Sequence, residues 1–201
     1  MSAMRVIAFH VIITAYGFWL PNDPRGSWSR WVRAWELAKF GPATKVSTHR
    51  SLARKSHDIQ QRLAAKRAMV REAVLFSGEQ ARIIAQAFGR RAAASGYAIH
   101  ACTMLPAHAH LVLGPMQTKI QKTIELLKAA ATTALIEADR HPFQNVFYRN
   151  GRRPTPWARG GWNRFCFTAE DVRRSIRYVQ DNPLKEGLRR QAWSFVTPYE
   201  I

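Results

Sequence analysis

The sequence predicts an α+β fold: a ferredoxin-like sandwich with a central antiparallel sheet and an insertion after the first strand. The first observation is size, because 201 residues, 47% of them hydrophobic, suffice for one domain with a sizeable core. The second is element order, since strand-like and helix-like stretches follow each other as two β-α-β units around a central hairpin. The third is a stretch dense in Pro, Gly and Trp that interrupts the first unit.

Four short apolar runs predict the strands of the sheet. The first run is rich in Val, Ile and Phe, as buried strands usually are. Pro106-Ala107 is a tight connection that makes a hairpin of the second and third runs. The four runs are residues 5–14, 97–105, 108–114 and 161–167.

Two helices are predicted between these strands. Ser77 and Gln80 have the spacing of a capping box, and Gly96 suits a C-terminal end. The first helix is therefore expected over residues 78–94. A second, longer helix fits residues 116–138.

A third helix is predicted after the last strand. Thr168 can cap it, and we expect it to run from about residue 169 to residue 181. Asn182-Pro183 should stop it there, because the residue before a proline disfavours helical geometry. The tail that begins at Trp193 is expected to pack back on the body.

The insertion is expected at about residues 20–76 of a single domain that spans residues 1–201. Residues 57–73 predict a basic helix or arm within it. Tryptophans are frequent here, and they have two interpretations. They can pack the loop onto the domain, which we favour, or stack on unpaired bases. The tryptophans in question are Trp19, Trp28, Trp31 and Trp35.

The charge of the chain points to a polyanionic partner. Lys and Arg number 31 against 13 acidic residues, a formal net charge of +18. A folded domain tolerates such self-repulsion most easily when it binds a polyanion, and nucleic acid is the leading candidate. A generally basic surface or adhesion to anionic lipid are the alternatives, although no lipid anchor motif is evident.

The cysteines and the first residues predict a cytoplasmic protein without a membrane segment, associated with the nucleoid. Cys102 and Cys166 have no CxxC spacing, so a disulfide scaffold or thiolate zinc site is not indicated. The apolar opening carries His10 in its middle and lacks a clean cleavage site. It is also too short to span a bilayer, and a buried strand explains it better.

Two histidines stand out in MLPAHAHLVLGP, residues 104–115. On a strand, His108 and His110 point to the same face, about 7 Å apart along the backbone. Imidazoles in this arrangement can bind a divalent metal. An HxH pair alone is a weak signal, and it indicates two histidines on a solvated face more often than a metal site.

A second pair of polar residues lies in SIRYVQDNPLKEGL, near the end of the last predicted helix. Tyr178 and Asn182 are four residues apart and share one helical face. A tyrosine can be a covalent nucleophile when its target is held and polarised. A metal bound by His108, His110 and Asn182 could polarise a phosphodiester in this way.

These motifs resemble those of a known family. MLPAHAHLVLGP followed some 60 residues later by RYVQDNPLKEGL is similar to the single-tyrosine HUH transposases, and more closely to their REP-associated tyrosine transposase branch. YGFWLPNDPRG near the first strand is also similar to a segment of some members. The resemblance covers the first strand and most of residues 97–196, and leaves about residues 28–76 unmatched.

The resemblance implies a metal-dependent single-stranded DNA endonuclease and strand transferase with the HUH fold. His108, His110 and Asn182 would hold Mg²⁺ or Mn²⁺. Tyr178 would attack single-stranded DNA and leave a 5′-phosphotyrosine and a free 3′-hydroxyl. The substrates would be hairpins from palindromic repeats beside the gene, and the protein a monomer or a homodimer.

Arginines around these motifs are candidate phosphate contacts. Some should bind DNA and others should form a solvated face. Arg177, which precedes the tyrosine, could also favour its phenolate. The candidates are Arg25, Arg152, Arg153, Arg159, Arg164, Arg173 and Arg177.

Three other functions are compatible with parts of this pattern. A non-catalytic module of RRM-like shape would stack aromatic residues on bases but needs no HxH pair. A replication initiator or relaxase of the HUH type is usually longer or carries a second nearby tyrosine. A metallohydrolase using the histidines with water would keep its activity without Tyr178.

Overall fold

The structure is a computed structural model that describes residues 5–48, 52 and 55–200. The chain divides into two compact units, and each is described by itself. Unit 1 comprises Met1–Thr14 and Leu75–Ile201, and unit 2 comprises Ala15–Val74. The boundaries of unit 2 lie close to those of the predicted insertion, about 20–76.

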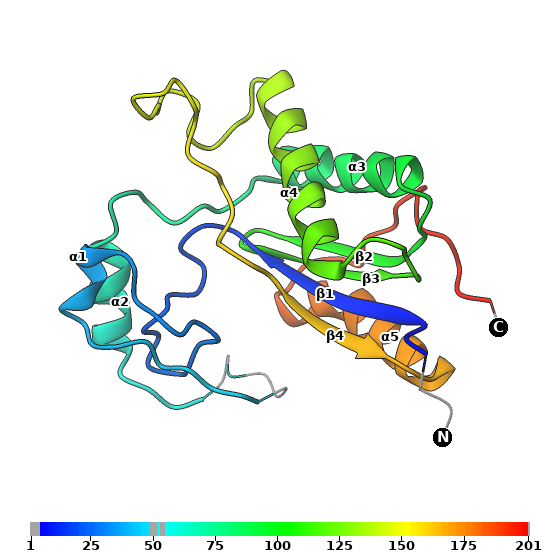
Figure 1. Ribbon diagram of the computed structural model, residues 1–201, viewed down its shortest axis with the longest axis horizontal. Helices are drawn as coiled ribbons and strands as arrows, with labels where there is room; N and C mark the ends of the chain where they lie inside the picture. Colours follow the sequence, from blue (N-terminus) through cyan, green and yellow to red (C-terminus); the bar gives the residue numbers. More distant parts are fainter. Residues whose placement is uncertain (1–4, 49–51, 53–54, 201) are drawn as a thin grey trace. The chain divides into compact units, whose positions relative to one another are not determined.

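Unit 1 is built on a four-stranded antiparallel sheet (Figure 1). The spatial order is β2-β3-β1-β4, and every neighbouring pair is antiparallel. Within unit 1, one helix lies between β1 and β2 and one between β3 and β4. With the strand order this is the ferredoxin-like arrangement, and the predicted α+β fold class is confirmed. The strands are β1 (Ala8–Thr14), β2 (Ile99–Leu105), β3 (His108–Leu113) and β4 (Trp162–Cys166).

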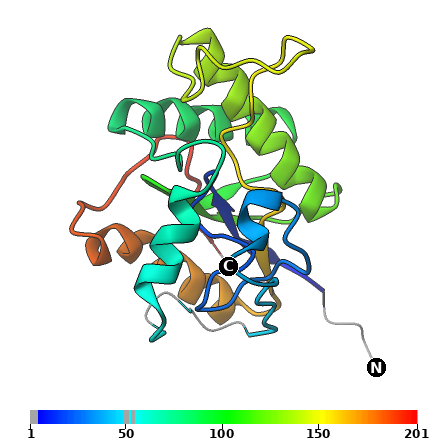
Figure 2. The same ribbon diagram turned by 90° about the vertical axis from the view of Figure 1, so that its left-hand side faces the viewer.

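Helices cover both faces of this sheet. In Figure 1 and Figure 2, α3 (Gly78–Ala94) and α4 (Ile120–Glu137) lie on one side, and α5 (Ala169–Lys185) lies on the other. Strand β3 serves both layers, because successive side chains on a strand point to opposite faces. One face of β3 carries Ala109, Leu111 and Leu113, which are all apolar. The other face carries His108, His110 and Val112, of which only the valine is apolar.

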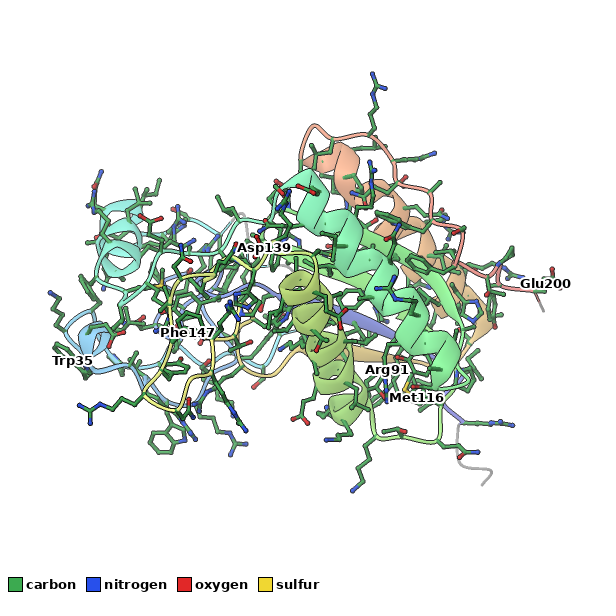
Figure 3. All side chains as sticks on the ribbon, turned by 90° about the horizontal axis from the view of Figure 1, so that it is seen from above. Trp35, Arg91, Met116, Asp139, Phe147 and Glu200 are labelled. Carbon is green, nitrogen blue, oxygen red and sulfur yellow. The ribbon has the colours of Figure 1, made fainter. Side chains whose placement is uncertain are left out.

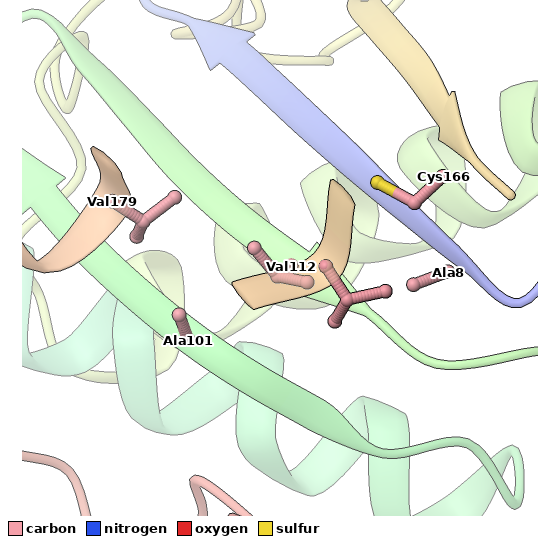
Figure 4. Packing of buried hydrophobic residues seen from close by; sticks show 6 residues of the cluster. Ala8, Ala101, Val112, Cys166 and Val179 are labelled. Carbon is pink, nitrogen blue, oxygen red and sulfur yellow. The ribbon is translucent and has the colours of Figure 1, made fainter. Parts of the chain in front are cut away.

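The apolar part of the α5 layer is a small cluster (Figure 4). Val172 and Val179 of α5 pack with Val112 of β3 and with residues of the other three strands. Burying these side chains stabilises the unit and fixes α5 on the sheet. The cluster consists of Ala8, Ala101, Val112, Cys166, Val172 and Val179.

Local sequence signals define two of the helix starts. Ser77 and Gln80 form the predicted capping box, and α3 covers Gly78–Ala94, as predicted. Thr168 caps α5 through the backbone N–H of Asp171. The predicted helix over 116–138 is shorter at its start, since α4 begins at Ile120.

The predicted end of the last helix at residue 181 is wrong, because α5 continues through Pro183 to Lys185. Pro183 has no N–H for the carbonyl of Val179 four residues earlier. That carbonyl accepts a hydrogen bond from the Thr103 hydroxyl instead, at 2.8 Å. The tertiary contact supplies what proline removes, so the helix tolerates the proline.

The signal that ends α5 is Gly187. Its φ is +70°, the left-handed conformation that glycine adopts most easily. The Gly187 N–H donates to the carbonyl of Leu184 at 3.2 Å. The Leu188 N–H donates to the carbonyl of Pro183 at 2.9 Å. This pair of bonds is a Schellman motif, which terminates helices.

The C-terminal tail packs against the outer edge of β2, as predicted. The Thr197 N–H donates to the Ile99 carbonyl at 2.9 Å. The side-chain amide of Gln191 both donates to the carbonyl of Met104 and accepts from its N–H. The tail therefore covers backbone groups that an edge strand would otherwise expose.

Unit 2 contains α1 (Trp35–Ala38) and α2 (Ile59–Arg67). The helix predicted over 57–73 is thus real but shorter, and Asp58 caps it. The core of unit 2 is a cluster of Leu20, Leu37 and Ala65. Within the described part of the chain, no helix of either unit has the length and apolar character needed to cross a membrane.

Candidate functional site

The two histidines of β3 lie on the face of the sheet that α5 covers. Their ring centroids are 4.9 Å apart. His108 pairs in register with Thr14 of β1, and His110 pairs with Ile12 of β1 and Thr103 of β2. Directly opposite residues share a face, so Thr103 stands beside His110 under α5.

A third imidazole, which the sequence analysis did not assign to the site, completes this group. His10 lies two residues before Ile12 on β1 and therefore on the same face as His110. Its Nε2 is 3.3 Å from Nδ1 of His110. One signal for it exists in the sequence: a histidine at an inward position of an otherwise apolar strand.

Tyr178 of α5 packs directly on the histidines. Its ring centroid is 5.4 Å from that of His10 and 5.5 Å from that of His110, both in edge-to-face geometry. The residue is 39% exposed, so a solvent-side ligand can reach it. The Nζ of Lys185 lies 4.2 Å from the ring centroid, a cation–π contact that holds the ring from another side.

Asn182 is buried one helical turn beyond Tyr178. Because they are four residues apart, Tyr178 and Asn182 are neighbours on one face of α5. The structure thus brings Tyr178 against the histidines and keeps Asn182 on the covered part of the same helix. Its role as a ligand stays a prediction.

Burial keeps the three imidazoles neutral. Desolvation lowers the pKa of His108 to about 4, and desolvation together with the positive charge of Arg164 lowers the pKa of His10 to about 4. For His110, burial is again the largest cause of a pKa well below its ordinary value, followed by its two histidine neighbours and Lys185. Neutral imidazole is the form that ligates metals.

The donor set fits a divalent metal in one specific protonation pattern. Because His110 Nδ1 faces His10, a metal would take Nε2 of His110. That requires Nδ1–H of His110 to donate to His10 Nε2, which fixes the tautomer in the way outer ligands usually do. Among the described residues, no three His, Cys, Asp or Glu side chains gather in a metal-binding arrangement.

The candidate DNA-binding arginines are found in different surroundings. Arg164 pairs in register with His10, so it stands on the site face of β4. Arg177 is exposed and donates to Glu170 at 3.1 Å. Arg153 donates to the carbonyl of Gln144, while the side chains of Arg152, Arg159 and Arg173 are exposed.

Arg25 of unit 2 is buried rather than presented on the surface. Its guanidinium forms a double hydrogen bond with Asp23, at 2.8 and 2.7 Å. It also stacks on Trp19, 3.8 Å from the ring centroid. These contacts commit the guanidinium to the internal structure of unit 2, and a phosphate contact by Arg25 would have to break them.

Several solved structures are similar to this chain, and two of them are described as transposases. One is a REP-associated tyrosine transposase bound to a REP hairpin, at 14% identity over 93% of this chain and 75% of that chain, with a TM-score of 0.46. The other is a putative transposase from Deinococcus radiodurans R1, at 13% identity over 95% and 97% of the two chains, with a TM-score of 0.42. No family model and no curated protein matches the chain.

Proposed function

We propose that this protein is a metal-dependent single-stranded DNA endonuclease and strand transferase that forms a covalent phosphotyrosine intermediate. One observation carries the proposal: the ring of Tyr178 is partly exposed, and its centroid lies 5.4 and 5.5 Å from those of the buried, neutral His10 and His110. A tyrosine that only packs the fold does not require imidazoles beside its ring. A module that only binds nucleic acid requires neither the tyrosine nor the histidines.

The reaction exchanges one phosphodiester for another. The Tyr178 hydroxyl oxygen bonds to phosphorus, the bond from phosphorus to the 3′-oxygen breaks, and the phenolic proton is balanced by the one that the 3′-hydroxyl gains. The products are a 5′-phosphotyrosine and a free 3′-hydroxyl. Because bond energy is conserved in the tyrosyl ester, a 3′-hydroxyl can reverse the step and join strands without ATP.

His108, His110 and Asn182 would hold Mg²⁺ or Mn²⁺, with phosphate oxygens of DNA completing the ligands. When bound, the ion supplies Lewis-acid polarisation of the scissile phosphate and a template for its orientation. His10 acts behind His110 by accepting the Nδ1–H, which keeps the other nitrogen free of a proton. The Thr103 hydroxyl holds α5 at Val179, one residue after the nucleophile.

The substrate we propose is single-stranded DNA with a hairpin. The net charge of +18 suits a polyanion, and Lys185 and Arg164 bring positive charge to the edge of the site. Tyr178 is partly exposed, so a phosphate of the strand can reach its hydroxyl from solvent.

The test uses labelled single-stranded hairpins taken from the repeats that flank the gene, incubated with the full chain and Mn²⁺ or Mg²⁺. Products are separated on a denaturing gel that retains DNA covalently bound to protein. Wild type is compared with Tyr178→Phe and with Tyr148→Phe, a similarly exposed tyrosine outside the site. We expect an adduct for wild type and Tyr148→Phe, and none for Tyr178→Phe or with EDTA.

Each other outcome points elsewhere. Cleavage that continues in Tyr178→Phe without an adduct would assign the histidines to a hydrolytic nuclease. Tight binding without cleavage of any hairpin, together with no Mn²⁺ binding that depends on His108, would assign the protein to the binding modules. A covalent adduct that persists in Tyr178→Phe would place the nucleophile on another side chain.

A further inference from the structure

Unit 2 exposes an unusual segment, WSRWVRAW, residues 28–35, here called the tryptophan–arginine segment. Its tryptophans are 49%, 71% and 84% exposed, in the order Trp28, Trp31, Trp35. Tryptophan is ordinarily highly buried, since each indole removes a large apolar area from water. Several exposed indoles in eight residues therefore indicate a surface that another molecule covers.

Unit 2 has an apolar core, and the tryptophan–arginine segment packs against it with its other side chains. Val32 and Ala34, which alternate with the tryptophans, pack against the cluster of Leu20, Leu37 and Ala65. The alternate positions of the segment are exposed, and they hold Trp31, Arg33 and Trp35. Small residues thus anchor the segment, and indole, guanidinium and indole point outward in turn. Trp35 stands at the first turn of α1 (Figure 3).

Another tryptophan of the same unit shows the contrasting arrangement. The Trp19 indole N–H donates to the carbonyl of Gly26 at 2.7 Å, and Arg25 covers the ring. A tryptophan that packs unit 2 is therefore bonded and covered by an arginine whose charge is neutralised by Asp23. The outward tryptophans stand beside Arg30 and Arg33 in a stretch without an acidic residue from position 24 to position 35.

The chemistry of this segment selects its ligand. Aromatic faces stack on unpaired bases of any sequence, and guanidinium groups between them contact the phosphates. Residues 15–74 hold twelve basic and four acidic residues, so the surroundings also favour a polyanion. A lipid surface or an apolar protein groove requires a continuous apolar face. Here the arginines interrupt the indoles and the aliphatic residues are turned inward.

We propose that the tryptophan–arginine segment is a base-stacking site for single-stranded nucleic acid, separate from the residues of the cleavage chemistry. It rests on the proposed function only in sharing single-stranded DNA as the ligand. Its role is to hold unpaired nucleotides by stacking, with little dependence on their sequence.

The experiment measures binding of a fluorescein-labelled 20-nucleotide oligo-dT, which forms no hairpin, to the full chain in EDTA. The variants are Trp31→Ala/Trp35→Ala and Trp31→Leu/Trp35→Leu, the second of which keeps apolar bulk but removes the aromatic face. We expect both to weaken binding at least tenfold, because each lost stacking contact weakens binding several-fold or more. Val70→Ala, at another exposed apolar residue of unit 2, should bind as wild type.

Quenching of tryptophan fluorescence by the oligonucleotide gives a second reading, and it should fall in both double variants. Because the mutated side chains are exposed, thermal melting should be unchanged, which excludes misfolding as the cause. Wild-type affinity in the alanine variant would overturn the proposal. Recovery of affinity in the leucine variant would also overturn it, since apolar contact rather than stacking would then explain the binding.

The outcome is distinguishable from that of the cleavage proposal. The tryptophan variants should still form the covalent adduct at saturating hairpin DNA, and failure of the cleavage proposal would leave their loss of oligo-dT binding in EDTA unaffected. Anionic phosphatidylserine vesicles are the remaining probe. Vesicle binding that depends on Trp31 and Trp35, without an effect on oligo-dT, would replace the base-stacking site with a lipid contact.

Discussion

The two faces of the sheet are made from the same strands and do different things. On the α3/α4 side, β3 contributes Ala109, Leu111 and Leu113, all fully buried. On the α5 side it contributes His108 and His110, and only Val112 is apolar. A period of two thus separates an apolar packing face from a buried polar cluster within six residues. The apolar face fixes the strands, and the other face can hold polar groups that are buried at a cost in stability.

Helix α5 is held on the sheet by two kinds of contact. Val172 and Val179 pack in the apolar cluster around Val112. The site end of the α5 face offers imidazoles and a threonine rather than aliphatic side chains. A hydrogen bond from Thr103 and a ring contact from Tyr178 position the helix there. Substitution of a site histidine on one face and of a buried leucine on the other should therefore give opposite signatures: mainly loss of activity for the histidine, and mainly loss of stability for the leucine.

The largest effect on the site face is expected for His110→Ala. We expect Mn²⁺-dependent adduct formation to fall by about 10³-fold or more, since metal polarisation of a phosphate contributes several kcal/mol. Calorimetric titration should show Mn²⁺ affinity lost. His100→Ala, at a histidine of β2 that contacts the tail at Thr197, should retain both. Unchanged metal affinity in His110→Ala would remove the imidazole from the ligand set.

The opposite signature is expected for Leu111→Ala, one residue away on the other face. Removal of a fully buried leucine should lower the free energy of unfolding by about 2–5 kcal/mol, because a cavity is left in a close-packed layer. Urea unfolding followed by circular dichroism measures it. Adduct formation per folded molecule at 20 °C should stay within about twofold of wild type, because site residues keep their places. A large loss of activity in the folded fraction would couple the two faces.

Most of the fold follows from local patterns, because its signals lie within a few residues of each other. The capping box at Ser77 and Gln80 and the hairpin at Pro106-Ala107 are of this kind. The end of α5 is not, because the Val179 carbonyl that Pro183 leaves without a helix partner accepts from Thr103, which lies 80 positions before the proline. A proline alone predicts a stop.

The site divides in the same way. The face shared by His108 and His110 follows from strand periodicity, and that of Tyr178 and Asn182 from helical spacing. His10 does not follow, because its partner His110 is 100 residues away and only the antiparallel pairing brings them together. The exposure of Trp31 and Trp35 was also beyond sequence reasoning, since an aromatic residue in a loop is compatible with packing and with stacking.

A smaller effect is expected when α5 is released at Val179. Thr103→Val keeps the shape of the side chain but leaves a buried carbonyl without a donor, which should cost about 1–3 kcal/mol in urea unfolding. Pro183→Ala in the same chain restores an N–H four residues after Val179, and the double variant should recover a large part of the loss. Additive losses in the double variant would show that the threonine hydroxyl does not substitute for the missing helix bond.

The smallest expected effect concerns Lys185, which lies over the Tyr178 ring at the solvent side. A partly exposed cation–π contact contributes about 0.5–1 kcal/mol, so Lys185→Met should slow adduct formation by about two- to fivefold and leave unfolding nearly unchanged. Lys185→Arg should restore the rate, because guanidinium also stacks on aromatic faces. Lys122→Met, at an exposed lysine of α4, is the matched control. A wild-type rate for Lys185→Met would mean that the ring contacts from His10 and His110 suffice to orient the nucleophile. Loss in both Lys185→Met and Lys122→Met would instead reflect the overall charge of the protein acting on DNA.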